Sequence, residues 1–109
     1  MTQLSLPEPI AAYFAADVRD SDAVANCFTP RGMVRDEGQT HAGRAAITAW
    51  KSAASAKYSY ATQPLRVEQE NGRHIVTARV IGNFPGSPVD LRFVFRLERG
   101  KISSLEIAP

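Results

Sequence analysis

The second half of the chain carries the pattern that most constrains the fold, a series of strands joined by tight turns. Leu65–Glu70 alternates between apolar and polar residues, as a half-buried strand does. Asn71-Gly72 follows, and this dipeptide strongly favours the two-residue turn of a β-hairpin. Further strands are predicted over His74–Phe84, Val89–Glu98 and Ile102–Ile107. We therefore expect an antiparallel meander over this half of the chain.

The first half has a helical period instead. After Pro7 and Pro9, which are tolerated in the first turn of a helix, a stripe of apolar residues recurs at helical spacing, namely Ile10, Tyr13, Phe14 and Val18. The segment Asp20–Asp22 breaks this helix and offers an N-cap for a short second helix, which is expected to end at Phe28. A third helix is predicted from Arg44 to Ala56, with Ile47, Trp50 and Ala54 on one face.

An acidic residue stands between the second and third helices. Thr29–Gly32 is typical of a turn, Met33–Arg35 of a short strand, and Asp36 follows at its end. Glu37–Gly43, which contains His41, is loop-like. Loops on rigid scaffolds often carry catalytic or binding residues, so Asp36 is a candidate site residue. It could equally be a solvated turn residue, because Asp favours turns.

Three helices followed by a meander predict one α+β domain over residues 1–109, with the helices packed on one face of the sheet. Within Val89–Glu98, the residues facing the helices would include Phe93 and Phe95. A strongly twisted sheet that wraps around helices forms a cone, and the open end of a cone is a natural ligand pocket.

Composition excludes several other classes of protein. The net charge is +2 with a pI near 9.0, and basic residues are dispersed, so no nucleic-acid surface is expected. No apolar stretch is long enough for a membrane span, and the N-terminus does not resemble a signal peptide. Cys27, the single cysteine, suits a reducing cytoplasm and reads as a small buried residue. Metal and nucleotide motifs are missing, so we expect no metal and no cofactor.

The order of these features resembles a known family. They are an aromatic first helix, a second helix that ends at Phe28, a strand ending in Asp36, the helix start Gly43-x-x-Ala46-Ile47 and the meander. Together they are similar to the nuclear transport factor 2 superfold. The likeness is to its bacterial branch of SnoaL-like polyketide cyclases and ketosteroid isomerases. It implies a cone-shaped curved antiparallel sheet wrapped around three N-terminal helices, and commonly a homodimer.

The resemblance also implies roles for individual residues. In ketosteroid isomerases the residue matching Asp36 is the general base, and Tyr13 matches the oxyanion-hole tyrosine. The second donor of that family, a protonated aspartate, is matched by Phe93, which cannot donate a hydrogen bond. Loss of such a donor costs about a hundredfold or more in rate. Steroid isomerisation is therefore not the expected reaction.

The candidate catalytic residues are Asp36, Tyr13 and His41, although Tyr13 could be a core aromatic and His41 a solvent-exposed loop residue. Residues expected to line the cone are Phe14, Trp50, Val80, Phe84, Leu91, Phe93, Phe95 and Leu105. The expected ligand is a small apolar molecule, bound by a cofactor-free isomerase or cyclase. A non-catalytic ligand-binding or protein-association domain is the alternative.

Arginines lie on the outer face of the predicted sheet, opposite the face that carries the phenylalanines. Arg79, Arg92 and Arg96 lie there with Asp90. A solvated surface is one interpretation, and a symmetric contact between two copies of the chain is the other. The mixed charges favour the homodimer.

Overall fold

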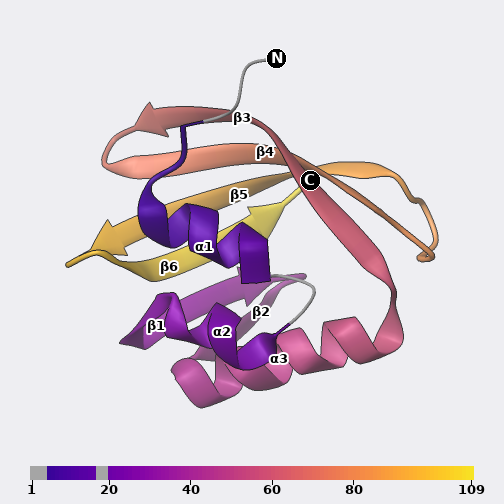
Figure 1. Cartoon of the computed structure of the whole chain (residues 1–109), viewed down its shortest axis with the longest axis horizontal. Coiled ribbons are helices and arrows are strands. Elements are labelled where there is room, and N and C mark those ends of the chain that lie inside the picture. Colours follow the sequence, from indigo (N-terminus) through magenta and orange to yellow (C-terminus); the bar gives the residue numbers. More distant parts are fainter. Residues whose placement is uncertain (1–4, 17–19) are drawn as a thin grey trace.

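The computed structural model describes residues 5–16 and 20–109. Three helices precede or interrupt the sheet (Figure 1): α1 spans Glu8–Ala16, α2 Ser21–Asn26 and α3 Arg44–Lys57. The predicted helices are confirmed, and Val18 lies outside the described residues. Asp20 caps α2 as expected, because its carboxylate accepts hydrogen bonds from the backbone N–H groups of Asp22 and Ala23.

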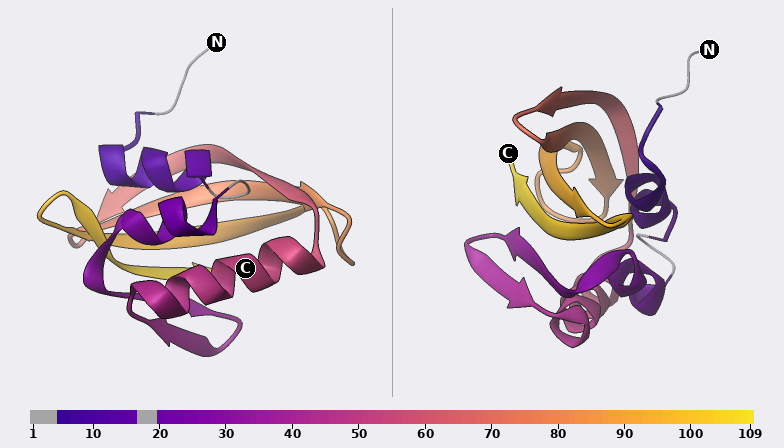
Figure 2. Two further views of the ribbon diagram at one scale, coloured as in Figure 1. Left: turned by 60° about the horizontal axis from the view of Figure 1, so that its bottom comes forward. Right: turned by 90° about the vertical axis from the view of Figure 1, so that its left-hand side faces the viewer.

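Six strands form one curved sheet in the order β2-β1-β6-β5-β4-β3. Their bounds are Phe28–Asp36 (β1), Gln39–Ala42 (β2), Tyr60–Glu70 (β3), Arg73–Gly82 (β4), Val89–Glu98 (β5) and Lys101–Ala108 (β6). Neighbours run antiparallel except β1 and β6, which pair in parallel, so the sheet is mixed. The sheet curls without closing, and the helices lie together on one side of it (Figure 2). This is the expected α+β cone.

The segment around Asp36 contains more strand than the sequence pattern indicates. Phe28 begins β1 and does not end α2, and Thr29–Gly32 is part of this strand where a turn was predicted. An irregular register between Phe28 and Met33 explains the error, since it disrupts the alternation that identifies a strand. Glu37–Gly43 is likewise not a loop. It contains the turn residues Glu37 and Gly38, both at positive φ, and then strand β2.

The strands of the meander are confirmed, with shifted ends. β3 begins at Tyr60, five residues earlier than predicted, and contains Pro64 beside a register shift. Proline lacks an N–H donor, but β3 is an edge strand and tolerates it there. β4 ends at Gly82, before Phe84. Asn71 and Gly72 both have positive φ in the tight turn between β3 and β4, as predicted.

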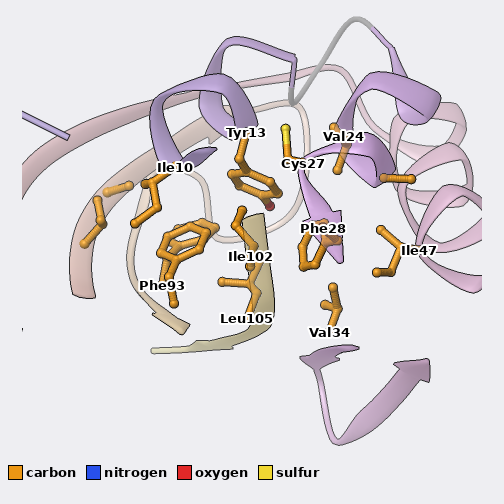
Figure 3. Packing of buried hydrophobic residues seen from close by; sticks show 14 residues of the cluster. Ile10, Tyr13, Val24, Cys27, Phe28, Val34, Ile47, Phe93, Ile102 and Leu105 are labelled. Carbon is orange, nitrogen blue, oxygen red and sulfur yellow. The ribbon is translucent and has the colours of Figure 1, made fainter. Parts of the chain in front are cut away.

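The core lies between the helices and the inner face of the sheet (Figure 3). Tyr13 points from α1 into this cluster, and its ring makes edge contacts with Phe14, Phe28 and Phe95 at centroid distances of 5.1, 6.4 and 5.5 Å. Phe93 and Phe95 face the helices, as the alternation of β5 predicts. Burial of these rings holds α1 against the sheet.

Hydrogen bonds to β1 fix the start of α3. The Arg44 guanidinium donates twice to the Phe28 carbonyl oxygen, from Nε at 3.1 Å and from Nη2 at 2.7 Å. The N–H of Gly43 donates to the Gly32 carbonyl oxygen at 2.8 Å. Gly43 has φ +86°, a conformation that other residues rarely adopt. These contacts determine which residues of α3 face the sheet.

Candidate functional site

A cavity of about 440 Å³ lies between α3 and the inner face of the sheet and is open to solvent on one side. Its lining is mostly apolar. Five of the predicted residues line it, together with the candidate catalytic pair Tyr13 and Asp36: Trp50, Val80, Phe84, Leu91 and Phe93. The size and the apolar lining are typical of sites for small organic molecules.

Asp36 reaches this cavity from the end of β1, and the neighbouring turn residue Glu37 also lines it. Its backbone is paired on both sides, with Gln39 of β2 and Ile107 of β6, so its position is set by the sheet. The indole Nε1 of Trp50 donates a hydrogen bond to Asp36 Oδ2 at 3.1 Å. Hydrogen bonds to a charged acceptor are among the stronger ones in proteins and restrict the rotation of the carboxylate. The sheet therefore fixes the backbone of Asp36, and the hydrogen bond from Trp50 orients its carboxylate at the rim of an apolar cavity.

Tyr13 belongs both to the core and to the cavity wall. The residue is fully buried, and its ring packs within the aromatic cluster of α1 and β5. The same residue lines the cavity. The two interpretations of Tyr13 given by the sequence are thus compatible, since an aromatic body can pack in the core while its hydroxyl serves a polar function.

Lys51 lines the same cavity and was not predicted from the sequence. The residue is only 4% exposed. The Nζ atom lies 5.0, 5.2 and 5.8 Å from the ring centroids of Trp50, Tyr60 and Tyr13, within the range of cation–π attraction. A sequence signal did exist, because position 51 follows Ile47 by four residues and so belongs to the buried face of α3.

His41 does not line the cavity. It lies on β2, where its ring is 6.0 Å from that of Trp50 and tilted by 32°. The predicted loop would have allowed His41 to fold over the cavity, whereas the observed hairpin holds it on an edge strand. His41 therefore packs beside Trp50, the residue that contacts Asp36.

Three other residues expected to line the cone are also absent from the cavity lining, Phe14, Phe95 and Leu105. Phe95 and Leu105 are fully buried in the core, and Phe14 packs against Phe93 and Phe95. Alternation in β5 places Leu91, Phe93 and Phe95 on one face, but α1 covers the Phe95 end of that face. Tyr60 and Thr62 at the start of β3 line the cavity instead, together with Tyr58 at the end of α3. The strand predicted from the sequence begins only at Leu65.

The outer face of the sheet carries Arg79, Arg92 and Arg96, all exposed. Arg79 pairs with Asp90 on the neighbouring strand, with Nε to Oδ1 at 2.9 Å and Nη2 to Oδ2 at 3.3 Å. This hydrogen bonding from Arg79 holds the pKa of the Asp90 carboxyl below its usual value. Ile81 on the same face is 47% exposed. The homodimer expected on this face stays a prediction.

Cys27 is buried beside α2, where its Sγ donates to the Ala23 carbonyl oxygen at 3.3 Å. Burial raises the pKa of the thiol. Such a group is a poor nucleophile, which agrees with a packing role. Over residues 5–16 and 20–109, the side chains form no cluster of three or more His, Cys, Asp or Glu that could hold a metal ion. Within the same ranges, no helix is long and apolar enough to cross a membrane.

Comparisons with known proteins agree with this architecture. A curved sheet around helices with a cavity at one end is the fold of ketosteroid isomerase-like and nuclear transport factor 2-like proteins, and solved structures of both kinds are similar to this chain. The family model of the SnoaL-like domain matches residues 9–105. The chain belongs to the SnoaL-like domain family. No curated protein is significantly similar to it.

Three solved structures illustrate the similarity. A candidate polyketide cyclase from Sinorhizobium meliloti is 42% identical, with 94% of each chain covered and a TM-score of 0.89. A protein with a ketosteroid isomerase-like fold from Catenulispora acidiphila, solved with trimethylamine, is 21% identical over 96% of this chain and 87% of that one, with a TM-score of 0.86. SalBIII, an epoxide hydrolase/cyclase-like enzyme of pyran ring formation in salinomycin, is 20% identical over 93% and 87%, with a TM-score of 0.79.

Proposed function

We propose that this protein is a cofactor-independent enzyme of the isomerase or cyclase type, in which Asp36 removes a proton from an apolar carbonyl compound. One observation carries the proposal: Asp36 and Tyr13 line the same apolar cavity, and Trp50 holds the Asp36 carboxylate by a hydrogen bond. The similarity to a candidate polyketide cyclase supports this class of reaction.

The cavity limits the substrate by size and polarity. A volume of about 440 Å³ fits a molecule of two or three fused rings. Valine, leucine and phenylalanine side chains from β4 and β5 form one wall, and Trp50 forms part of the other. Exclusion of water by these side chains would strengthen the interaction of Asp36 with the reacting proton.

The chemistry follows from a fixed carboxylate beside a carbonyl compound. Asp36 would accept a proton from the carbon next to the carbonyl, which leaves an enolate. Return of the proton at another carbon completes an isomerisation. Alternatively, attack of the enolate carbon on a second carbonyl of the same molecule closes a ring, and the alkoxide formed from that carbonyl takes the proton back from Asp36. Tyr13 is the candidate donor to the enolate oxygen. Phe93 cannot donate a second hydrogen bond to the enolate oxygen, so steroid isomerisation is not among the proposed reactions.

Hydrogen–deuterium exchange of a model ketone tests the role of Asp36. 2-Tetralone is a bicyclic ketone of suitable size, and NMR in D2O follows the loss of its acidic C1 protons. The wild-type protein should accelerate this exchange, and Asp36→Asn should reduce the acceleration about 100-fold or more. Asp90→Asn is the matched control, because Asp90 lies on the outer face of the sheet. Exchange that continues unchanged in Asp36→Asn would refute the assignment of the base.

The same experiment separates the enzyme from a passive binding domain. Quenching of Trp50, the single tryptophan, reports binding in the cavity independently of exchange. Binding of 2-tetralone without accelerated exchange would favour the non-catalytic alternative. Exchange that depends on Asp36 would exclude it.

A further inference from the structure

We propose that Tyr58 and Phe84 form a fixed aromatic wall that sets the length of the ligand. The cavity then takes compact carbonyl compounds of two or three fused rings and rejects longer compounds of the same chemistry. This inference deepens the proposed function and rests on it, because it places the reacting carbon of the ligand at Asp36. It assigns the choice of substrate to residues that take no part in the proton transfer.

The wall lies beyond Asp36 along α3. Trp50, which donates a hydrogen bond to Asp36, is in the middle of α3, and Tyr58 is the C-cap of this helix, eight residues further on. Eight residues of an α-helix rise about 12 Å. Tyr58 and Phe84 both line the cavity, and their rings meet edge to face at a centroid distance of 6.0 Å. A ligand held at Asp36 and lying along α3 would therefore reach these rings after about the length of two or three fused rings.

Hydrogen bonds between the neighbouring residues hold the two rings together. Ser59 follows Tyr58, and its backbone N–H donates to Asn83 Oδ1 at 2.9 Å. The N–H of Asn83, which precedes Phe84, donates in turn to the Ser59 carbonyl oxygen at 3.1 Å. The end of α3 and the loop between β4 and β5 lie at the same end of the molecule (Figure 2, left). This reciprocal pair joins them directly, so separation of the rings requires the loss of both hydrogen bonds.

Gly82 allows the two segments to come this close. It pairs with Tyr60 at the start of β3. A Cβ atom at position 82 would collide with the Ser59 carbonyl oxygen and would lie 2.6 Å from Tyr60 Cβ, so a larger residue would push β3 away from β4. The N–H of Gly82 also donates to Ser87 Oγ at 2.8 Å, and the N–H of Ser87 donates to the Phe84 carbonyl oxygen at 3.3 Å. These contacts close the loop that carries Phe84 and fix the position of its ring.

A fixed wall selects ligands by repulsion. A ligand that is too long must displace the rings of Tyr58 and Phe84 or hold its carbonyl away from Asp36, and either reduces its affinity. Additional apolar area would otherwise raise the affinity. Weaker binding of a longer and more apolar compound therefore identifies a wall, whereas an open groove or a movable lid would bind that compound more tightly.

Two ketones that differ only in length test the wall. 6-Phenyl-2-tetralone extends 2-tetralone by one ring at the end opposite the carbonyl, and calorimetry measures both affinities. We expect the wild-type protein to bind 2-tetralone at least about 10-fold more tightly than the longer ketone. Phe84→Ala should remove this preference, so that the longer ketone binds at least as tightly as the shorter one. Ile81→Ala is the matched control and should retain the preference, because Ile81 lies on the outer face of β4.

Three results would overturn the proposal. The first is a wild-type protein that binds the longer ketone as tightly as 2-tetralone or more tightly. The second is a preference that Phe84→Ala leaves unchanged. The third is a wild-type protein that binds neither ketone. If circular dichroism shows that Phe84→Ala does not fold, Phe84→Val removes the ring with less loss of packing and is judged by the same results.

Asn83 tests whether the wall is fixed. It is a positioning residue, because it contacts Ser59 and does not line the cavity. Asn83→Ala removes the hydrogen-bond acceptor and should reduce the preference for 2-tetralone about threefold or more, whereas Asn83→Asp keeps an acceptor and should retain the preference. A merely structural role would lower the urea midpoint of Asn83→Ala and leave the ratio of the two affinities unchanged, and that result would refute a fixed wall.

The outcomes separate the wall from the proposed base. Asn has nearly the shape of Asp, so Asp36→Asn should abolish the accelerated exchange of 2-tetralone and keep the preference for it over the longer ketone. Asp36-dependent exchange without a preference for the shorter ketone would refute the wall alone. A preference without any accelerated exchange would refute the role of Asp36 alone.

Discussion

Phe95 and Phe93 lie two residues apart on the same face of β5, and their substitution should have opposite consequences. Phe95 is fully buried, and its ring packs against Tyr13, Phe14 and Phe93 at 5.5, 5.8 and 6.5 Å. Phe93 is also buried, but one side of it forms the cavity wall. We predict that Phe95→Ala mainly reduces stability and that Phe93→Ala mainly alters ligand binding.

The magnitudes follow from the surroundings of each ring. Truncation of a buried phenylalanine costs about 3–5 kcal/mol, because apolar contacts are lost and an empty space remains. Phe95→Ala should fall in this range. Phe93→Ala should cost less, about 2 kcal/mol, because the space it leaves joins a cavity already open to solvent. Since a domain is stabilised by only about 5–15 kcal/mol, Phe95→Leu is the safer variant, with an expected loss of about 1–2 kcal/mol.

Urea denaturation followed by circular dichroism measures the loss, and quenching of Trp50 by 2-tetralone measures binding. We expect Phe95→Leu to lower the urea midpoint and leave the dissociation constant within about twofold. Phe93→Leu should change the dissociation constant more than the midpoint. A Phe95→Leu protein of unchanged stability, or one whose binding changes more than that of Phe93→Leu, would refute this division between core and cavity.

Three further predictions concern other parts of the molecule. Asp20→Ala removes the N-cap of α2 and should lower the free energy of unfolding by about 1 kcal/mol in urea titrations, whereas Asp20→Asn should largely preserve it. Because burial raises the pKa of Cys27, the thiolate is scarce at pH 8, and iodoacetamide should modify the folded protein at least about 10-fold more slowly than the urea-unfolded chain; equal rates would show that the thiol is accessible. If the outer sheet face forms a homodimer, light scattering at micromolar concentration should give twice the mass of 11.9 kDa and Ile81→Lys should halve it, while a monomeric wild-type protein would contradict the dimer.

The sequence predicted the elements whose signals are local. The cap at Asp20, the Asn71-Gly72 turn and the alternation of β5 each depend on a few neighbouring residues, and all three are found in the structure. β1 and β2 were missed in part because their signals are not local. The irregular register of β1 breaks the alternation, and Glu37-Gly38 is a less familiar turn pair than Asn-Gly.

The candidate site was only partly predictable for a similar reason. Alternation identifies which face of β5 points inward, but only the position of α1 determines that Phe95 is covered while Leu91 and Phe93 remain at the cavity. Lys51 was not predicted, because a charged residue among the apolar residues of a helix is usually expected to be exposed to solvent. Its contacts come from three separate elements, and no spacing in the sequence brings Tyr13, Trp50 and Tyr60 together.

The parallel pairing of β1 with β6 affects the order in which the site can form. Phe28 pairs with Ile102, and Asp36 pairs with Ile107, so these contacts join segments that are far apart in the sequence. Such contacts form late and slow the folding of a chain. Ile107 also lines the cavity. Because β6 lies inside the sheet between β1 and β5, loss of this strand would divide the sheet, remove Ile107 from the cavity lining and remove one of the two strands that pair with Asp36. The site therefore depends on the integrity of the whole sheet and not on a local element.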